Sequence, residues 1–118
     1  MFEMIFFATD AGRQPVKEFL DALDVKMRNK VLDNLKHLQI HGHHLREPYS
    51  KPLGDGIFEL RTRLGSDITR VLYFFFVGKR IVLTHGFVKK TQKTPPQEIE
   101  RAKEYRAMYH KREENSNG

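Results

Sequence analysis

The alternation of apolar and polar side chains in the middle of the chain constrains its fold more than any other feature. Residues 57–64 alternate with a period of two, which predicts a strand with one charged face and one buried face. Residues 69–77 and 80–88 are almost continuously apolar, and short turns containing Gly65 and Gly78 lead into them. Three strands in succession, joined by tight turns, predict an antiparallel meander.

Helical patterns precede this meander. After an apolar strand within residues 1–10, which we expect to lie inside the sheet, the spacing of apolar residues from Pro15 to Leu23 predicts a short helix. Asp24 can cap a second helix that ends near Gly42. We expect the two helices to form a hairpin packed against the sheet.

A third helix is predicted after the meander. Thr94 and Gln97 have the spacing of a capping box, and prolines occupy the first turn. The apolar stripe of this helix consists of Ile99, Ala102, Tyr105 and Tyr109. The expected fold class is therefore α+β: a small antiparallel sheet with a mixed edge, packed against an N-terminal helical hairpin, with a C-terminal helix. Residues 1–112 are expected to form a single domain and residues 113–118 a disordered tail.

Composition narrows the classes of function. Lysine and arginine outnumber acidic residues 21 to 15, and the formal net charge of +6 favours a polyanionic partner without choosing among RNA, DNA and an acidic protein. The 118 residues include no cysteine, which excludes disulfides and thiolate metal sites. No segment resembles a signal peptide, and the apolar runs are too short to span a bilayer, so we expect a cytoplasmic protein.

Cationic residues gather where the last strand meets the final helix. The segment His85–Pro96 carries three lysines and their hydrogen-bonding neighbours at the strand exit. Arg61 and Arg70 occupy strand positions upstream, and they converge with the lysines if the three strands pair as a meander. Fixed positive charge at such a place suits a phosphate group, and we interpret the cluster as an RNA-cleaving site.

Each cation has a task in this interpretation. Cleavage of RNA by its own 2′-hydroxyl requires alignment, stabilisation of charge on the phosphorane and proton transfer to the leaving oxygen. Arg61 and Arg70 suit charge stabilisation, because a guanidinium donates several hydrogen bonds and stays protonated. Lys89 or Lys90 suits proton transfer, because crowded cations lower one another's pKa.

Structural interpretations of the same residues stay open. Glu59 shares the strand face of Arg61, so the arginine can instead be half of a salt bridge, and the lysines can simply be solvated. Four histidines have weak metal-binding spacing, and we expect no metal site at His37, His41, His43 and His44. His85 is either a satisfied core histidine or a group beside the lysines.

Aromatic residues also admit two interpretations. The run Tyr73–Phe76 can offer stacking platforms for bases, but consecutive aromatics in a central strand are typical of core packing. Tyr49 lies in the basic connection between Arg46 and Lys51 and is the better stacking candidate, with coverage of the sheet edge as the alternative.

Three segments together resemble the HigB-like branch of the RelE/ParE superfamily of bacterial and phage toxins: GIFELRTR, TRVLYFFF and HGFVKKTQKTPPQEIERAK. The resemblance implies a RelE-like fold and the toxin of a type II toxin-antitoxin system, a ribosome-dependent endoribonuclease that cleaves mRNA and inhibits translation without metal or cofactor. It also implies three partners, namely mRNA, the rRNA of the ribosomal decoding site and a HigA-like helix-turn-helix antitoxin. No membrane partner is implied.

The resemblance also assigns individual residues. Catalysis is assigned to Arg61, Arg70, Lys89 and Lys90. Beyond what the resemblance assigns, we predict RNA-binding roles for Lys51, Arg63, Thr91, Gln92 and Lys93. Well-studied RelE members use a tyrosine in the carboxy-terminal segment, but no tyrosine precedes Tyr105 there, which favours a lysine base or substrate-assisted proton transfer.

Two alternatives to the enzyme stay open. A non-catalytic nucleic-acid-binding regulator would use the same basic face for phosphate contacts alone. An inactive relative, kept as part of a repressor complex, is the other. The sequence does not choose between the two lysines as general base.

Overall fold

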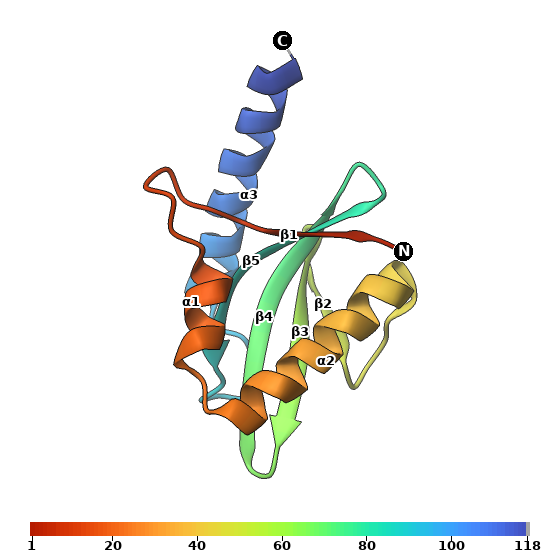
Figure 1. The fold of residues 1–118 in the computed structure, drawn as a ribbon, viewed down its shortest axis with the longest axis vertical. Coiled ribbons are helices and arrows are strands. Elements are labelled where there is room, and N and C mark those ends of the chain that lie inside the picture. Colours follow the sequence, from red (N-terminus) through yellow and green to blue (C-terminus); the bar gives the residue numbers. More distant parts are fainter. Residues whose placement is uncertain (118) are drawn as a thin grey trace.

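The antiparallel meander is the centre of the structure. In the computed structural model, which describes residues 1–117, it consists of β3 (Ile57–Leu64), β4 (Asp67–Phe76) and β5 (Arg80–Val88) (Figure 1). Within the described residues these strands belong to a five-stranded sheet with the order β1-β5-β4-β3-β2. The three strands predicted from alternation and glycine turns, and their antiparallel pairing, are therefore confirmed.

An additional strand, β2 (Ser50–Gly54), does not follow from the sequence pattern. It pairs antiparallel with β3 at the sheet edge, where Lys51 lies opposite Glu59 and Pro52 opposite Phe58. Proline lacks an amide hydrogen and is tolerated at an edge, and the segment has no apolar alternation that would reveal a strand. Strand β2 forms because its backbone pairs with the backbone of β3, so the side chains of residues 50–54 give little indication that the segment is a strand.

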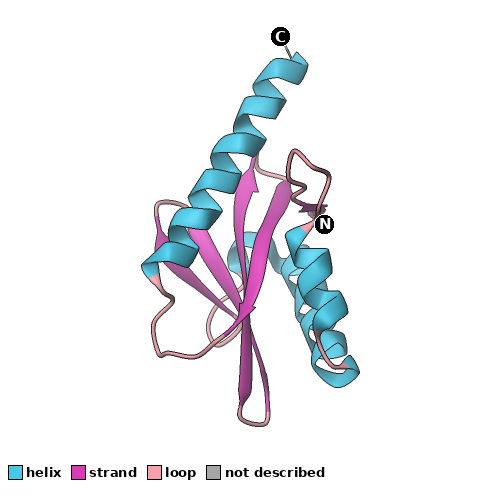
Figure 2. Cartoon of the chain, turned by 90° about the vertical axis from the view of Figure 1, so that its left-hand side faces the viewer, coloured by secondary structure: helices cyan, strands magenta, loops and turns pink. Residues whose placement is uncertain are grey.

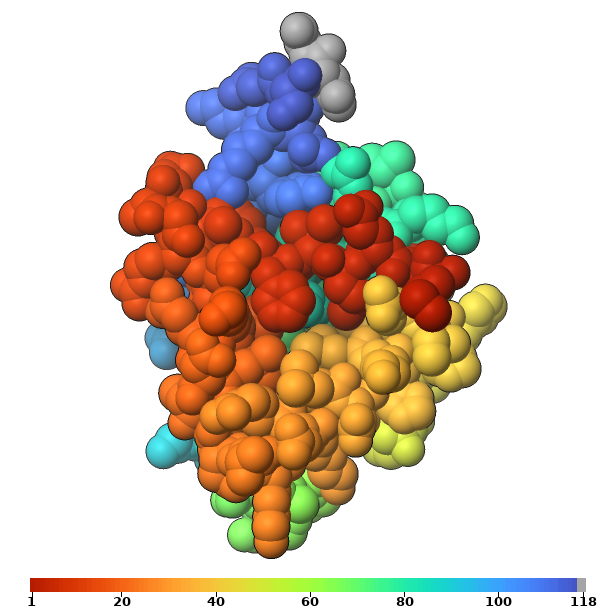
Figure 3. Space-filling view, viewed as in Figure 1, coloured from red at the N-terminus to blue at the C-terminus, as the bar shows by residue number. Residues whose placement is uncertain are grey.

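The N-terminal strand, β1 (Glu3–Phe6), lies at the opposite edge and not inside the sheet as expected. It pairs in parallel with β5, with Met4 beside Ile81, so the sheet is mixed at this edge. Its apolar composition has another cause: Met4 and Phe6 pack toward one core cluster, and Ile5 packs toward the other. Figure 3 shows this N-terminal segment (red) at the surface beside the two helices that follow it (orange).

Two helices cover one face of the sheet at the positions that the sequence predicts. They are α1 (Pro15–Ala22) and α2 (Val25–His41), and the short 3₁₀ turn η1 (Gly42–His44) follows. The Asp24 side chain accepts a hydrogen bond from the amide of Lys26 at 3.0 Å, which confirms the predicted cap. Among the strands of the sheet, α1 contacts mainly β5, and α2 contacts mainly β3.

The final helix, α3 (Pro96–Asn117), covers the other face, so the sheet is the middle of three layers (Figure 2). Ala102 is fully buried in the core on this side, as the apolar stripe predicts. The start of the helix differs from the predicted capping box. The hydroxyl of Thr94 donates to the buried carboxylate of Glu59 and so contributes to the sheet side of the interface.

The end of α3 lies where a disordered tail is expected. Residues 113–117 are helical, because Glu113 forms a salt bridge with Arg80 and Arg112 pairs with Asp10 at 2.8 Å. These pairs attach the last turns to the body of the protein beyond the apolar stripe. Residue 118 of the expected tail lies outside the described residues. None of the helices in residues 1–117 is long and apolar enough to cross a bilayer.

Gly86 determines how closely α1 approaches the sheet. It lies in β5 opposite Val71 of β4, and a Cβ atom placed on it would be 2.5 Å from the ring atom Cδ2 of Phe19. That distance is far inside van der Waals contact, so only glycine allows α1 to pack at this depth.

We expect Gly86→Ala to lower the free energy of unfolding by about 1–3 kcal/mol, because the added methyl group overpacks the α1 interface. Urea denaturation followed by circular dichroism measures this change. Gly65→Asn is the matched control, since φ is 62° there, which asparagine tolerates, and no neighbouring atom lies within 4 Å of the position of a Cβ. An unchanged midpoint for Gly86→Ala would contradict the packing argument.

Candidate functional site

A buried carboxylate, that of Glu59, binds two arginines of the sheet, and we call the surface around Arg61, Arg70 and the loop lysines the basic face. Glu59 is fully buried, and its Oε2 accepts a hydrogen bond from Nε of Arg61 at 2.6 Å. Its Oε1 accepts one from Nη1 of Arg70 at 3.1 Å. Arg61 and Arg70 lie opposite each other in the β3–β4 register, so both side chains are on the face that α3 covers. The alternative of a salt bridge for Arg61 is therefore confirmed, and the face expected to be charged is partly buried.

Arg70 is buried beneath the loop that follows β5. Only 1% of the residue is exposed, and its Nη2 donates to the backbone oxygen of Gln92 at 2.9 Å. Its Nη1 also donates to Oγ1 of Thr94, which donates in turn to Oε1 of Glu59. Desolvation lowers the pKa of Arg70, and the charge of Glu59 opposes that shift. Arg70, which the sequence predicts to stabilise the charge on a phosphorane, is instead placed in this structure to anchor the loop.

Three of the predicted site residues meet in one cavity of about 240 Å³, which we call the Tyr49 pocket. Its cationic lining comes from β3, from α2 and from the residue after β5, namely Arg61, Arg63, Lys30 and Lys89. The pocket forms at the sheet edge because the pairing of β2 with β3 ends at Leu60, which leaves the rest of that edge open.

The ring of Tyr49 forms one wall of this pocket. It stacks with the ring of His37, with 6.2 Å between centroids, and His37 stacks in turn with His41 at 6.3 Å. Tyr49 is nevertheless 47% exposed, so part of its surface is accessible from solvent. Within residues 1–117, no three His, Cys, Asp or Glu side chains are grouped so that they could hold a metal ion.

Lys89 has a lowered pKa. Desolvation lowers the pKa of its ammonium group, and the positive charges of Arg70 and Arg61 lower it further. Its backbone amide donates to the oxygen of Ile68 at 2.8 Å, which ties this end of β5 to β4. Lys90 is exposed and does not line the Tyr49 pocket. Of the two lysines, therefore, Lys89 lies with the arginines of the Tyr49 pocket and Lys90 does not.

The remaining predicted residues line two neighbouring cavities. The loop pocket, about 250 Å³, includes in its lining Lys89, Lys90, Thr91 and Lys93. The Lys51 pocket, about 240 Å³, includes in its lining Lys51, Gln92 and Lys93. Arg70 lines both of these cavities, and Lys89 lines both the loop pocket and the Tyr49 pocket. All nine predicted residues therefore surround three cavities that share lining residues.

His85 is a satisfied core histidine. It is 4% exposed, its Nδ1 lies 3.1 Å from Oγ1 of Thr84, and its Nε2 lies 3.2 Å from Oε1 of Glu98. Desolvation lowers its pKa, while the carboxylate of Glu98 raises it. The side chain lines none of the three cavities and connects β5 with α3.

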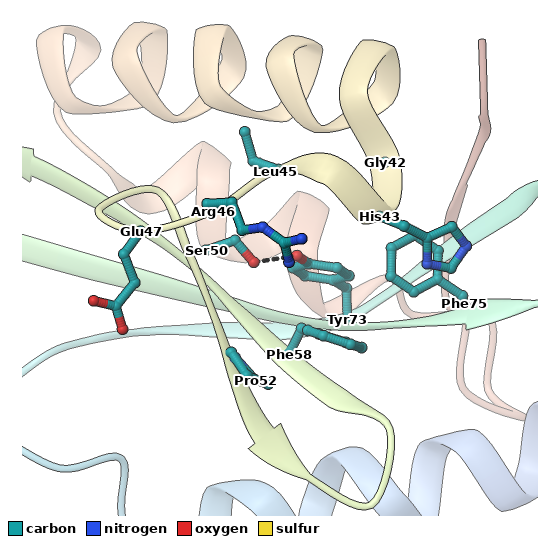
Figure 4. A pocket seen from close by; sticks show the side chains of 10 residues that line it. All are labelled: Gly42, His43, Leu45, Arg46, Glu47, Ser50, Pro52, Phe58, Tyr73 and Phe75. Atoms are coloured by element: carbon teal, nitrogen blue, oxygen red, sulfur yellow. Dashed lines mark hydrogen bonds between the residues drawn. The ribbon is translucent and has the colours of Figure 1, made fainter.

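The aromatic run of β4 packs in the core. Tyr73 and Phe74 are each 1% exposed and belong to the clusters on opposite faces of the sheet. Figure 4 shows a further cavity, about 140 Å³, beside this run. In it the ring of His43 stacks on Phe75 with 3.7 Å between centroids, and a hydrogen bond of 2.5 Å joins Oγ of Ser50 to the Tyr73 hydroxyl. This cavity contains none of the nine predicted residues in its lining.

Two polar residues that line the Tyr49 pocket, Lys30 and Asn34, are missing from the sequence prediction. Nδ2 of Asn34 donates to the backbone oxygen of Arg61 at 3.3 Å and to Oγ1 of Thr62 at 3.0 Å. Asn34 falls on the buried side of α2, and a polar residue at such a position indicates a buried contact. Lys30 has no comparable signal, because it is one of several exposed polar residues on the helix.

The three cavities of this small α+β protein share cationic lining residues, and such a concentration of positive charge is typical of a protein that binds a polyanion. Residues 18–107 match the family described as phage derived protein Gp49-like (DUF891), which lies within the RelE/HigB-like toxin superfamily, and the chain belongs to this family. The matched region contains every residue of the predicted site. No curated protein matches the chain.

We expect Glu59→Gln to lower the free energy of unfolding by roughly 3–5 kcal/mol, because it leaves the buried Arg70 without its countercharge. Urea denaturation measures the change. Glu18→Gln is the matched control, since it removes a carboxylate from the exposed pair with Arg13 and should leave the midpoint near that of the wild type. Equal stability of the two variants would contradict the anchoring role of Glu59.

The lowered pKa of His85 predicts a dependence of stability on pH. Because burial disfavours the imidazolium in the folded state, the unfolded state binds the proton more readily. The stabilisation is present above about pH 6.5, the ordinary pKa of histidine, and is lost as the pH falls toward the folded-state value. The nearby Glu98 favours the imidazolium and Arg101 opposes it, with burial as the largest effect.

We therefore expect the free energy of unfolding of the wild type to fall more steeply between about pH 7 and pH 5 than that of His85→Gln. Glutamine keeps hydrogen-bonding capacity at this position and does not titrate. Urea denaturation at closely spaced pH values measures both slopes. Parallel curves for the two proteins would show that His85 does not contribute to the pH dependence.

Proposed function

We propose that the protein is the toxin of a type II toxin-antitoxin system, a HigB-like endoribonuclease that cleaves mRNA on the ribosome. The Tyr49 pocket carries the proposal, because it gathers four cations and an accessible tyrosine ring around a space of about 240 Å³. Membership of a phage-derived, toxin-like family supports it. The formal charge of +6 suits a protein that docks against ribosomal RNA.

In this proposal the Tyr49 pocket binds one phosphodiester of single-stranded mRNA. The guanidinium of Arg61, positioned by Glu59, donates to the nonbridging oxygens and stabilises the charge that develops on the phosphorane. Arg63 and Lys30 bind neighbouring phosphates, and the ring of Tyr49 stacks on a base. Arg70 holds the loop in place from below.

Lys89 is the proposed proton-transfer group. The 2′-oxygen attacks phosphorus while the neutral amine of Lys89 takes the hydroxyl proton, the bond from phosphorus to the 5′-oxygen breaks, and the leaving oxygen takes a proton from water. The ammonium of Lys89 then returns its proton to solvent. The products are a 2′,3′-cyclic phosphate and a 5′-hydroxyl end. The lowered pKa makes the neutral amine available at a lower pH than in an ordinary lysine. The proposed reaction requires neither a metal nor a cofactor.

Dependence on the ribosome has a physical reason in this scheme. A site that lacks a strong general base gains most when the ribosome aligns its substrate, because alignment can lower the activation barrier by roughly 7–11 kcal/mol. The proposal also includes a HigA-like helix-turn-helix antitoxin in the cytoplasm. Such a partner would inhibit the toxin by covering the basic face or by blocking entry to the decoding site.

A non-catalytic nucleic-acid-binding regulator is the second candidate, and one observation favours it. Glu59 neutralises part of the charge that Arg61 and Arg70 would offer to a phosphate, and Arg70 is buried. In a regulator, substitution of Lys89 changes only the affinity for nucleic acid and its salt dependence, and the bound RNA stays intact.

We expect Lys89→Ala to slow single-turnover mRNA cleavage by roughly 10²–10⁴-fold in a reconstituted translation mixture. Mapping of mRNA 5′ ends measures the rate and the position of the cut. Lys89→Arg keeps the positive charge but cannot give up its proton, so it should be as slow as Lys89→Ala. Cleavage by the wild type should accelerate as the pH rises toward the pKa of Lys89, and both variants should lose this acceleration.

Lys111→Ala is the control for that experiment, since Lys111 is an exposed lysine of α3 that lines none of the three cavities. It should cleave mRNA at the wild-type rate. If the wild type inhibits translation and leaves every mRNA whole, the enzyme is contradicted and the regulator supported. If Lys89→Arg cleaves as fast as the wild type, Lys89 contributes charge and not proton transfer.

A further inference from the structure

One buried donor of the basic face has no partner among the described residues. Nε of Arg70 is closed to solvent and makes no hydrogen bond with any side chain or backbone group of residues 1–117, although both other nitrogens of the guanidinium are bonded. A buried N–H without a partner destabilises the folded state, so such a group requires an explanation. An oxyanion is the acceptor that best suits a charged donor.

The loop pocket is one of the two cavities that Arg70 lines. Arg70 lines it together with three lysines of the loop, in a volume of about 250 Å³. Those lysines are Lys89, Lys90 and Lys93. All three are exposed or half-buried, so their flexible side chains can turn toward a group bound in the cavity. A small cavity lined by four cationic residues suits a phosphate.

The charge balance around the loop pocket is positive. Its acidic lining residue is Glu98, whose carboxylate already lies 3.2 Å from Nε2 of His85. Arg70 shares the carboxylate of Glu59 with Arg61, so two guanidinium groups face one acid there. Among the residues that line the pocket, Arg70 and the three lysines are opposed only by Glu98, an excess of three positive charges.

The start of α3 adds to this charge. The helix has 22 residues and begins at Pro96, and both Pro95 and Glu98 line the loop pocket. The N-terminal end of a helix carries a partial positive charge that stabilises a nearby anion. The dipole of α3 and the unpaired donor of Arg70 therefore favour the same kind of ligand in the same cavity.

From these observations we infer that the loop pocket is a second phosphate site next to the Tyr49 pocket. Lys89 lines both cavities, so two phosphates of one single-stranded chain are bound on either side of its side chain. Donation from the buried Nε of Arg70 to the second phosphate requires the loop to move outward, which breaks the hydrogen bonds of Arg70 to Thr94 and to the Gln92 carbonyl. The inference rests on the proposed function for its substrate, and it adds that the protein binds RNA across at least two phosphates.

Nuclear magnetic resonance of the arginine Nε–H groups tests the donor directly. Because the Nε–H of Arg70 is buried, we expect it to exchange slowly with solvent and so to be recognisable in ¹⁵N-labelled protein. We expect its resonance to shift on titration with inorganic phosphate, and to require about tenfold more phosphate in a Lys90→Ala/Lys93→Ala double variant. A resonance that stays in place at saturating phosphate and saturating RNA would overturn the inference.

The dependence of affinity on RNA length tests the second site. Fluorescence anisotropy with oligouridylates of about two to eight nucleotides should show a step in affinity when the chain becomes long enough to reach the loop pocket. The Lys90→Ala/Lys93→Ala variant should lose this step and bind long RNA about tenfold more weakly at low salt. The magnitude of its slope of log affinity against log salt should fall by about 0.7 for each phosphate that the protein no longer neutralises.

Two single variants are the controls. Lys30→Ala, in the Tyr49 pocket, should weaken binding of every length alike, and the exposed Lys111→Ala should bind as the wild type does. Equal losses from Lys111→Ala and the double variant would indicate general electrostatic attraction and overturn the inference. If the wild type cleaves mRNA but the double variant binds every length normally, only the second site fails. If the step and the resonance shift occur without cleavage, only the proposed enzyme activity fails.

Discussion

The carboxylate of Glu59 is the interaction on which the basic face depends. Without it, Arg61 and Arg70 would place two like charges opposite each other across β3 and β4, which destabilises a sheet. A buried arginine is costly unless its charge is paired and its donors are bonded, and Glu59, Thr94 and the carbonyl of Gln92 meet most of that requirement. The same contacts join the lysine-bearing loop to the sheet in this structure.

Much of the fold follows from local patterns in the sequence. Alternation and glycine turns indicate β3, β4 and β5, and Asp24 before an apolar stripe indicates α2. Strand β2 does not follow, because Lys51 and Pro52 carry no strand pattern. The edge position of β1 does not follow either, since a strand covered on both faces is as apolar as a central one. The length of α3 depends on the tertiary pair of Arg80 and Glu113, which no local pattern reveals.

The site is predictable only in part. An antiparallel meander places Arg61 opposite Arg70, so their proximity follows from the strand pattern. The burial of Arg70 does not follow, because it depends on a loop around Thr94 whose sequence equally suits a helix cap. Lys30 reaches the Tyr49 pocket only because α2 packs on β3, a contact between segments far apart in the chain. Side chains that look like surface charge along the sequence can therefore be buried once the elements assemble.

The parallel pairing of β1 with β5 has a consequence for how the chain is made. Residues 3–6 pair with residues 80–83, so the strand that leaves the ribosome first is the one that completes the sheet last. Contacts between such distant segments form slowly, because a long loop has to close before they stabilise anything. A nascent chain therefore carries an unpaired first strand until residues 80–83 have been made, and its basic cavities assemble only after residues 89–98 have followed.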